Sequence, residues 1–142
     1  MSPAGSKAGA DRAGSAIILI RILVAWVFLS EGIQKFLFPS ELGVGRFHKL
    51  GFPWPHALAI LVAVVEILCG VAVLLGIRTR WAAFALLCVN IAAIVTTKIP
   101  LYMHKGLWIT LHDSRTGISM FLCLLFLIIA GGGAYAFQNR SA

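Results

Sequence analysis

The sequence predicts an all-α, polytopic membrane protein, a bundle of four transmembrane helices. Hydrophobic residues make up 60% of the 142 residues and charged residues only 12%, whereas soluble proteins average about 45–50% and 25%. Four mainly apolar runs of about twenty residues recur, and each is long enough to cross a bilayer. The four Trp residues, at 26, 54, 81 and 108, mostly fall near the ends of these runs, as in an aromatic belt.

The chain divides into four predicted spans within one domain, residues 16–137. Residues 1–15, rich in Ala, Gly and Ser, are expected to form a disordered cytoplasmic tail, and residues 138–142 a short second tail. The first apolar run is too long for a signal peptide and three more follow it, so it is interpreted as an uncleaved helix. The predicted spans are residues 16–38, 56–76, 81–100 and 117–137.

Two long loops and one tight turn join the predicted spans. The loop at 39–55 is rich in Gly and Pro and holds several aromatic residues, so we expect it to lie on the membrane surface or dip into it. Residues 101–116 are expected to form the second long loop. The compact turn at 77–80, Ile-Arg-Thr-Arg, favours cytoplasmic termini under the positive-inside rule. We therefore expect a multi-pass protein of the cell inner membrane with both long loops outside.

The net charge of +7 indicates lipid as the anionic partner. The basic residues are scattered and mostly flank the apolar runs, a distribution that fits membrane edges and anionic lipid headgroups better than nucleic acid. Arg21, near the start of the first span, is interpreted as a snorkelling interfacial residue and not as a site residue.

Several kinds of chemistry are disfavoured. Cys69, Cys88 and Cys123 fall inside apolar runs without Cys-x-x-Cys spacing, so we interpret them as buried apolar side chains. The sequence has no phosphate-cradling Gly loop, nucleophile elbow or dinucleotide fingerprint. No metal or other cofactor is therefore predicted within the chain, and a redox cofactor would be a diffusible molecule or sit in a partner. The histidines, whose spacing fits no metal site, are His48, His56, His104 and His112.

Polar residues occur inside the predicted spans. Glu31 and Lys35 lie four residues apart, so on a helix they share a face, with Gln34 beside them. Charges at membrane depth are costly and usually face a bundle interior or a wet cavity. At 1.5 Å per residue, Glu31 lies roughly 10 Å below the outer end of its span. By the same count, Glu66 and Asn90 lie near the midplane.

These residues predict one pocket that opens outward or toward the outer leaflet. Glu66 and Asn90 would form its floor, and Lys98 would lie at the depth of Lys35. Asp113 and Arg115 would stand at its outer mouth. The candidate catalytic residues are Glu31, Lys35, Glu66 and Lys98, and the candidate ligand-binding residues are Gln34, Arg46, Asn90, Trp108 and Arg115.

Short motifs recur in order along almost all of residues 16–137. They are Ser-Glu-Gly-Ile-Gln-Lys-Phe (30–36), Leu-Gly-Val-Gly-Arg-Phe (42–47), Val-Val-Glu-Ile-Leu-Cys-Gly (64–70), Leu-Leu-Gly-Ile-Arg-Thr-Arg (74–80), Thr-Lys-Ile-Pro (97–100) and Arg-Thr (115–116). This series of motifs resembles the DoxX family. The resemblance implies a four-helix inner-membrane protein, often a small subunit of redox assemblies such as an archaeal thiosulfate:quinone oxidoreductase. The motif positions that carry over are Glu31, Gln34, Lys35, Arg46, Glu66, Lys98 and Arg115.

Our first hypothesis is a membrane component of a quinone-linked oxidoreductase or oxidative-stress system. A quinone would enter the pocket, Lys35 or Lys98 would hydrogen-bond a carbonyl, and Glu31 or Glu66 would relay protons. Electrons would come from a redox partner protein, because the chain has no identifiable redox centre.

Two alternatives remain open at this point. In one, the chain is a non-enzymatic scaffold or assembly factor that holds a soluble redox partner by its outer loops. The polar cluster would then be paired ions that fix helix register, although such pairs add little net stability. In the other, Lys35, Lys98 and Arg115 serve a small anion or lipid carrier, which would need a homo-oligomer because one four-span protomer is small for alternating access.

Overall fold

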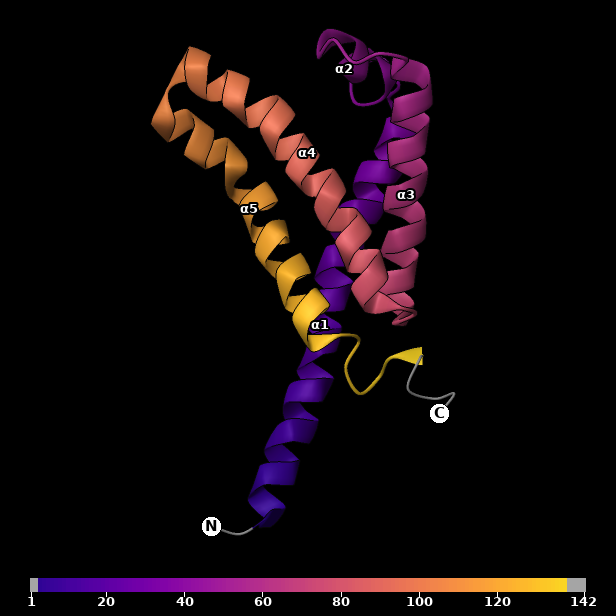
Figure 1. Ribbon diagram of the computed structural model, residues 1–142, viewed down its shortest axis with the longest axis vertical. Helices are drawn as coiled ribbons and strands as arrows, with labels where there is room; N and C mark the ends of the chain where they lie inside the picture. Colours follow the sequence, from indigo (N-terminus) through magenta and orange to yellow (C-terminus); the bar gives the residue numbers. More distant parts are fainter. Residues whose placement is uncertain (1–2, 138–142) are drawn as a thin grey trace.

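The computed structural model describes residues 3–137 and confirms the all-α prediction (Figure 1). No strand occurs in this range. Four helices, α1 over Arg12–Leu37 and the whole of α3, α4 and α5, are long and apolar enough to cross a membrane. The five helices are α1 (Pro3–Leu37), α2 (Val44–Lys49), α3 (Pro55–Leu75), α4 (Thr79–Lys105) and α5 (Leu107–Ala130).

The four long helices pack as two pairs, α1 along α3 and α4 along α5, joined by contacts between α3 and α4. Figure 1 shows α2 and the α4–α5 connection at one end of the molecule, which we call the loop end. The α3–α4 turn and the segment after α5, residues 131–137, lie at the other, which we call the turn end. The first turns of α1 extend beyond the other helices at the turn end.

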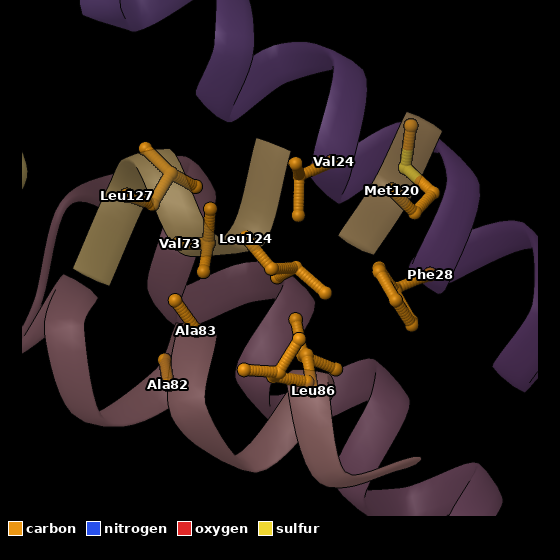
Figure 2. Packing of buried hydrophobic residues seen from close by; sticks show 10 residues of the cluster. Val24, Phe28, Val73, Ala82, Ala83, Leu86, Met120, Leu124 and Leu127 are labelled. Atoms are coloured by element: carbon orange, nitrogen blue, oxygen red, sulfur yellow. The ribbon is translucent and has the colours of Figure 1, made fainter. Parts of the chain in front are cut away.

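The hydrophobic core lies in the turn-end half of the bundle. Its residues come from all four long helices, and Figure 2 shows their side chains meeting between them. Small residues let α4 approach its neighbours closely, as is common between helices in membranes. The buried cluster consists of Val24, Phe28, Val73, Ala82, Ala83, Leu86, Leu87, Met120, Leu124 and Leu127.

Arg21 is part of this interior, so its interpretation as a snorkelling surface residue was wrong. Only 2% of Arg21 is exposed. Its guanidinium donates to the carbonyls of Val73 (2.8 Å), Leu74 (2.5 Å) and Gly132 (3.1 Å). The last carbonyls of a helix have no partner within that helix. Arg21 donates hydrogen bonds to two carbonyls at the end of α3. Its bond to the Gly132 carbonyl connects the segment after α5 to the same guanidinium.

The segment expected as a disordered tail is helical from Pro3 onward. Ala has the highest helix propensity, and Pro is well suited to the first helical position. A helix that continues from a formed span also needs no new nucleus. Residues 1–2 and the predicted short tail at 138–142 lie outside the described part of the chain.

The prediction of a long loop at 101–116 was wrong. Helix α4 continues through Pro100, and α5 begins directly after Gly106. Backbone groups in lipid must be paired internally, and proline is tolerated inside membrane helices for that reason. The connection is a single residue, Gly106, with φ 82°, which glycine adopts without strain. Helix α5 likewise ends at Ala130, before the predicted end of its span at 137.

Candidate functional site

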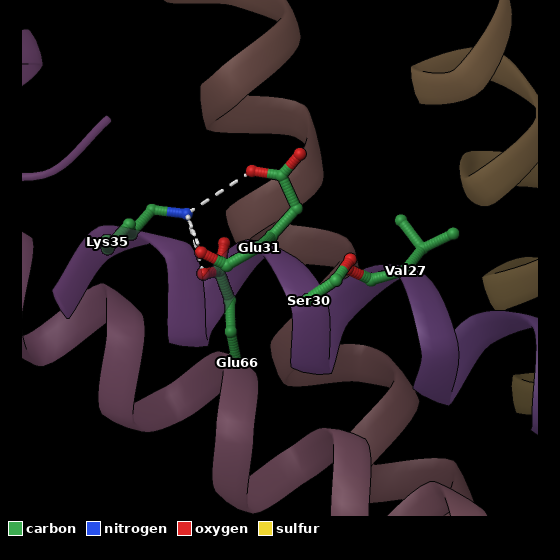
Figure 3. Close-up of polar contacts among 5 residues, drawn as sticks. All are labelled: Val27, Ser30, Glu31, Lys35 and Glu66. Atoms are coloured by element: carbon green, nitrogen blue, oxygen red, sulfur yellow. Dashed lines mark hydrogen bonds and ion pairs between the residues drawn. The ribbon is translucent and has the colours of Figure 1, made fainter. Parts of the chain in front are cut away.

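A buried ion pair joins α1 to α3 in the loop-end half (Figure 3). Lys35 Nζ donates to Glu66 Oε2 at 2.7 Å, and only 9% and 5% of the two side chains are exposed. The same Nζ lies 3.6 Å from Glu31 Oε2, whose side chain is 51% exposed. The spacing of Glu31 and Lys35 on one helix face predicted the second contact. The structure adds the first, shorter one, between helices.

A glycine on α1 allows this pair to form. An added Cβ at Gly32 would lie 2.8 Å from Ile67 Cγ1 and 2.9 Å from the Ala63 carbonyl oxygen. Only a residue without a side chain lets the two helix backbones approach this closely. Gly32 is one turn before Lys35, so the approach brings the lysine within reach of Glu66.

The ion pair lies on the wall of a cavity of about 300 Å³ between α1, α3, α4 and α5. We call it the polar cavity, because its wall holds three basic and three acidic side chains. These are Lys35, Arg46, Lys98, Glu31, Glu66 and Asp113. Further lining residues are Val27, Phe28, Val89, Asn90, Ala93, Ile94, Thr97, Thr116, Gly117 and Met120. Acidic and basic side chains are therefore equal in number on this wall.

A second cavity of about 360 Å³, the apolar cavity, adjoins the first. The two share Lys35, Arg46, Glu66, Val89, Ala93 and Thr97. The remaining lining side chains are largely apolar and come from α2, α3, α4 and the segment after α2. They are Phe47, Leu50, Phe52, Leu58, Val62, Cys88, Ala92 and Thr96. Together the cavities offer one charged compartment and one apolar compartment on either side of the ion pair.

Asn90 fixes the position of α5 at the floor of the polar cavity. It is buried, and its Nδ2 donates to the Gly117 carbonyl at 3.0 Å. An added Cβ at Gly117 would lie 3.2 Å from Ile94 Cγ1, so α4 and α5 also approach closely here. The amide therefore holds together the two helices that form the far wall, opposite Lys35.

The structure brings together six of the nine candidate site residues and leaves three apart. Gln34, Trp108 and Arg115 line neither cavity. Trp108 is 82% exposed, as expected of an aromatic side chain at a membrane edge. Arg115 Nε instead donates to the carbonyl oxygen of His112 at 3.0 Å, and Arg115 Nη2 lies 2.9 Å from Nε2 of the His112 ring. The six on the polar cavity are Glu31, Lys35, Arg46, Glu66, Asn90 and Lys98.

The helical course of α5 explains why Asp113 faces the cavity and Arg115 does not. Residues two apart on a helix point about 200° away from each other, since each residue turns the chain by about 100°. A loop at 101–116 would have let both reach one mouth. The threonines of the cavity, Thr97 and Thr116, were not singled out as site residues, because single hydroxyls in apolar runs are common.

Metal binding finds no support in the geometry. Among the side chains that the structure describes, no three His, Cys, Asp or Glu residues lie close enough to hold a metal ion. The three cysteines are free thiols. The two cavities present ammonium, guanidinium, carboxyl, amide and hydroxyl groups, and the Cys88 thiol lines the apolar cavity.

Comparisons with known proteins agree with the fold and the motifs. The DoxX family profile matches residues 16–99. The chain is 46% identical to "Uncharacterized membrane protein Rv3486" of Mycobacterium tuberculosis, over 88% of this chain and 80% of that protein. It is 28% identical to an uncharacterized protein of Haemophilus influenzae, over 87% of this chain and 89% of that protein. No solved structure gives a significant match. The chain is a membrane protein of the DoxX family.

Proposed function

We propose that this protein binds a quinone-like amphiphile at the Lys35–Glu66 pair, as the membrane component of a quinone-linked redox system. The observation that carries the proposal is the position of this pair on the wall shared by the polar and apolar cavities. A quinone has a polar head and an apolar tail. The head would contact Lys35 and Glu66, and the tail would lie along Phe47 and Phe52.

The contacts of Lys35 suit a quinone carbonyl. Its ammonium group has three donors, of which one points to Glu66 Oε2 at 2.7 Å and one to the Glu31 carbonyl at 3.3 Å. A donor placed where negative charge develops stabilises the reduced form, and does so more strongly where water is excluded. Lys98 and Arg46, on the same cavity wall, would add to this field.

The acidic groups would carry the protons that quinone reduction consumes. A quinone takes up two electrons and two protons to become a quinol. The contacts run from the half-exposed Glu31 through Lys35 to the buried Glu66. Such a series of titratable groups can pass protons from the loop end to a bound head group. The electrons would come from a redox partner protein.

Titration calorimetry of the purified protein in detergent tests the proposal. We expect saturable binding of a benzoquinone with a decyl tail, and binding at least tenfold weaker for benzoquinone without a tail. Decanol serves as the control for the tail alone. Saturable binding of decanol would favour a lipid carrier instead, and the absence of saturable quinone binding would contradict the proposal.

Two pairs of matched variants assign the binding to the site. Glu66→Gln and Lys35→Met should each weaken quinone binding at least tenfold. Glu41→Gln and Lys49→Met remove the same charges from exposed side chains that line neither cavity, and should leave the affinity unchanged. Equal effects of the two pairs would show that charge in general, and not the site, matters.

We also propose an inner-membrane location with both termini in the cytoplasm. Arg78 and Arg80 lie at the turn end, and basic residues in short connections favour the cytoplasmic side. In a variant without native cysteines, the thiol introduced by Ile77→Cys should resist an impermeant maleimide in intact cells. The thiol introduced by Lys49→Cys should react. The reverse pattern would invert the topology and put the polar cavity on the cytoplasmic side.

A further inference from the structure

The turn end contains a third cavity, separate from the proposed quinone site. It measures about 790 Å³ and lies where α4 begins and α5 ends. Trp81, which lines it, is exposed, and exposed Trp residues at helix ends sit at the depth of lipid headgroups. Its lining residues are Arg78, Thr79, Arg80, Trp81, Ala130, Gly131, Gly132 and Gly133.

The charge of this cavity is entirely positive among its lining residues. Arg78 and Arg80 contribute two guanidinium groups, and no acidic residue lines the cavity among the side chains that the structure describes. Arg80 Nη2 donates to the Ile129 carbonyl at 3.2 Å. An added Cβ at Gly131 would lie 3.4 Å from Arg80 Nε, so the guanidinium rests beside the glycine backbone. Arg80 is thereby held at the rim with further N–H groups to offer.

The N-terminus of α4 points its amides toward the same region. Arg78 precedes the helix, and no side chain caps it with a hydrogen bond. The amides of Trp81 and Ala82 bond to the Arg78 carbonyl, but those of Thr79 and Arg80 come too early for an acceptor within the helix. Aligned peptide dipoles make this end of the 27-residue helix positive.

Thr79 provides an independent indication that something polar belongs here. Only 2% of Thr79 is exposed, and its Oγ1 has no hydrogen-bond partner among the described residues. An added Cβ at Gly132 would lie 2.8 Å from this oxygen, so the hydroxyl faces the glycine wall of the cavity. Buried hydroxyls without a partner are costly and uncommon. A ligand oxygen in the cavity would accept its hydrogen bond.

We propose that this cavity binds a phosphate group, carried by an anionic phospholipid headgroup or supplied as free phosphate. A phosphate oxygen is a strong acceptor for the Thr79 hydroxyl and for the amides of Thr79 and Arg80. The guanidinium groups of Arg78 and Arg80 neutralise its charge with charge-assisted hydrogen bonds. Basic pockets between membrane helices bind lipid headgroups in this way. The Arg-Thr-Arg turn would thereby bind a ligand in addition to setting the orientation of the protein in the membrane.

Thermal unfolding of the full-length protein in neutral detergent tests this site. One arm adds phosphatidylglycerol, a second adds inorganic phosphate at constant ionic strength, and phosphatidylcholine is the neutral-headgroup control. We expect a saturable rise in melting temperature with one of the two anionic probes. A rise with the lipid alone identifies the headgroup as the source. A rise with inorganic phosphate identifies free phosphate.

Three variants and one control locate the binding. Thr79→Val removes the unpaired hydroxyl at equal size, so the protein should fold at least as stably while its affinity for the probe falls about tenfold. Thr79→Ser keeps the hydroxyl and should retain affinity. Arg80→Gln should also weaken binding about tenfold, whereas Lys49→Gln, at the loop end, should not. Unchanged affinity in Thr79→Val, or no saturable response to either probe, overturns the proposal.

Discussion

The two halves of the bundle bury a cation each, and they do so in opposite ways. At the turn end, Arg21 is surrounded by the carbonyls of Val73, Leu74 and Gly132. At the loop end, Lys35 is paired with the carboxylates of Glu66 and Glu31. Carbonyls neither gain nor lose protons, whereas a lysine–carboxylate pair can exchange them. The first arrangement serves the structure, and the second has groups that can take part in chemistry.

The packing around the two cations also differs: side chains fill the turn-end half, whereas cavities lie in the loop-end half. The apolar cluster fills the turn-end half between all four long helices. In the loop-end half, Figure 1 shows α4 and α5 diverging from α1 and α3, and the polar and apolar cavities lie there. We conclude that the turn end holds the helices together while the loop end remains open for a ligand.

The largest effect should come from Arg21→Met. It removes the Arg21 donor from the carbonyls of Leu74 and Gly132 and leaves the Val73 carbonyl with the Gly76 amide alone. A lost hydrogen bond in a membrane protein costs about 0.6–1.7 kcal/mol, more where a buried group stays unpaired. We expect the free energy of unfolding in detergent to fall by about 2–5 kcal/mol. Lys49→Met removes an exposed cation that lines neither cavity and should change it by less than about 0.5 kcal/mol. Similar values for both would show that Arg21 is not a structural anchor.

The second-largest effect should be a difference in unfolding free energy between leucine truncations in the two halves. Leu124 is fully buried in the apolar cluster, so Leu124→Ala loses packing contacts and leaves a void, at about 2–4 kcal/mol. Leu58 already borders the apolar cavity, and Leu58→Ala should cost less than about 1 kcal/mol. Unfolding followed by circular dichroism gives both values. Equal costs would mean that the loop end is packed as tightly as the turn end.

A smaller effect is expected from Gly32→Ala. The new methyl group would meet Ile67 and the Ala63 carbonyl, which forces α1 from α3 at about 1–3 kcal/mol. Quinone affinity should fall as well, because Lys35 moves from Glu66. Gly9→Ala has open space around its Cβ and should be neutral or slightly stabilising. Unchanged binding in Gly32→Ala would separate the ion pair from the ligand.

The sequence was sufficient to predict that polar residues of different spans lie at similar levels of the bundle, since a helix rises by a fixed 1.5 Å per residue. Counting from the span ends put Glu31, Lys35, Glu66, Asn90 and Lys98 within one region, and all five line the polar cavity. Depth can be counted along one span without knowledge of the others. Which helix faces which follows from packing, and so the Lys35–Glu66 contact was not foreseen.

The remaining errors concern partners that are distant in sequence and the direction in which side chains point. The acceptors of Arg21 lie 52, 53 and 111 residues away, and no local pattern indicates them. The charged residues at 104–115 resembled a loop, yet they lie on the helices on either side of Gly106. Because α5 begins directly after that glycine, the Asp113 side chain points to the cavity and the Arg115 side chain points away from it.

The central claim is that the Lys35–Glu66 pair is a ligand site and not a support for the fold. The double variant Lys35→Met with Glu66→Gln tests it most directly, because it removes both members of the buried pair together and leaves only the half-exposed Glu31 without its lysine. We expect its free energy of unfolding to stay within about 1 kcal/mol of the parent protein. Calorimetry should at the same time show that its affinity for the decyl-tailed benzoquinone is at least tenfold weaker. A double variant that fails to fold, or one that binds the quinone as the parent protein does, would contradict the claim.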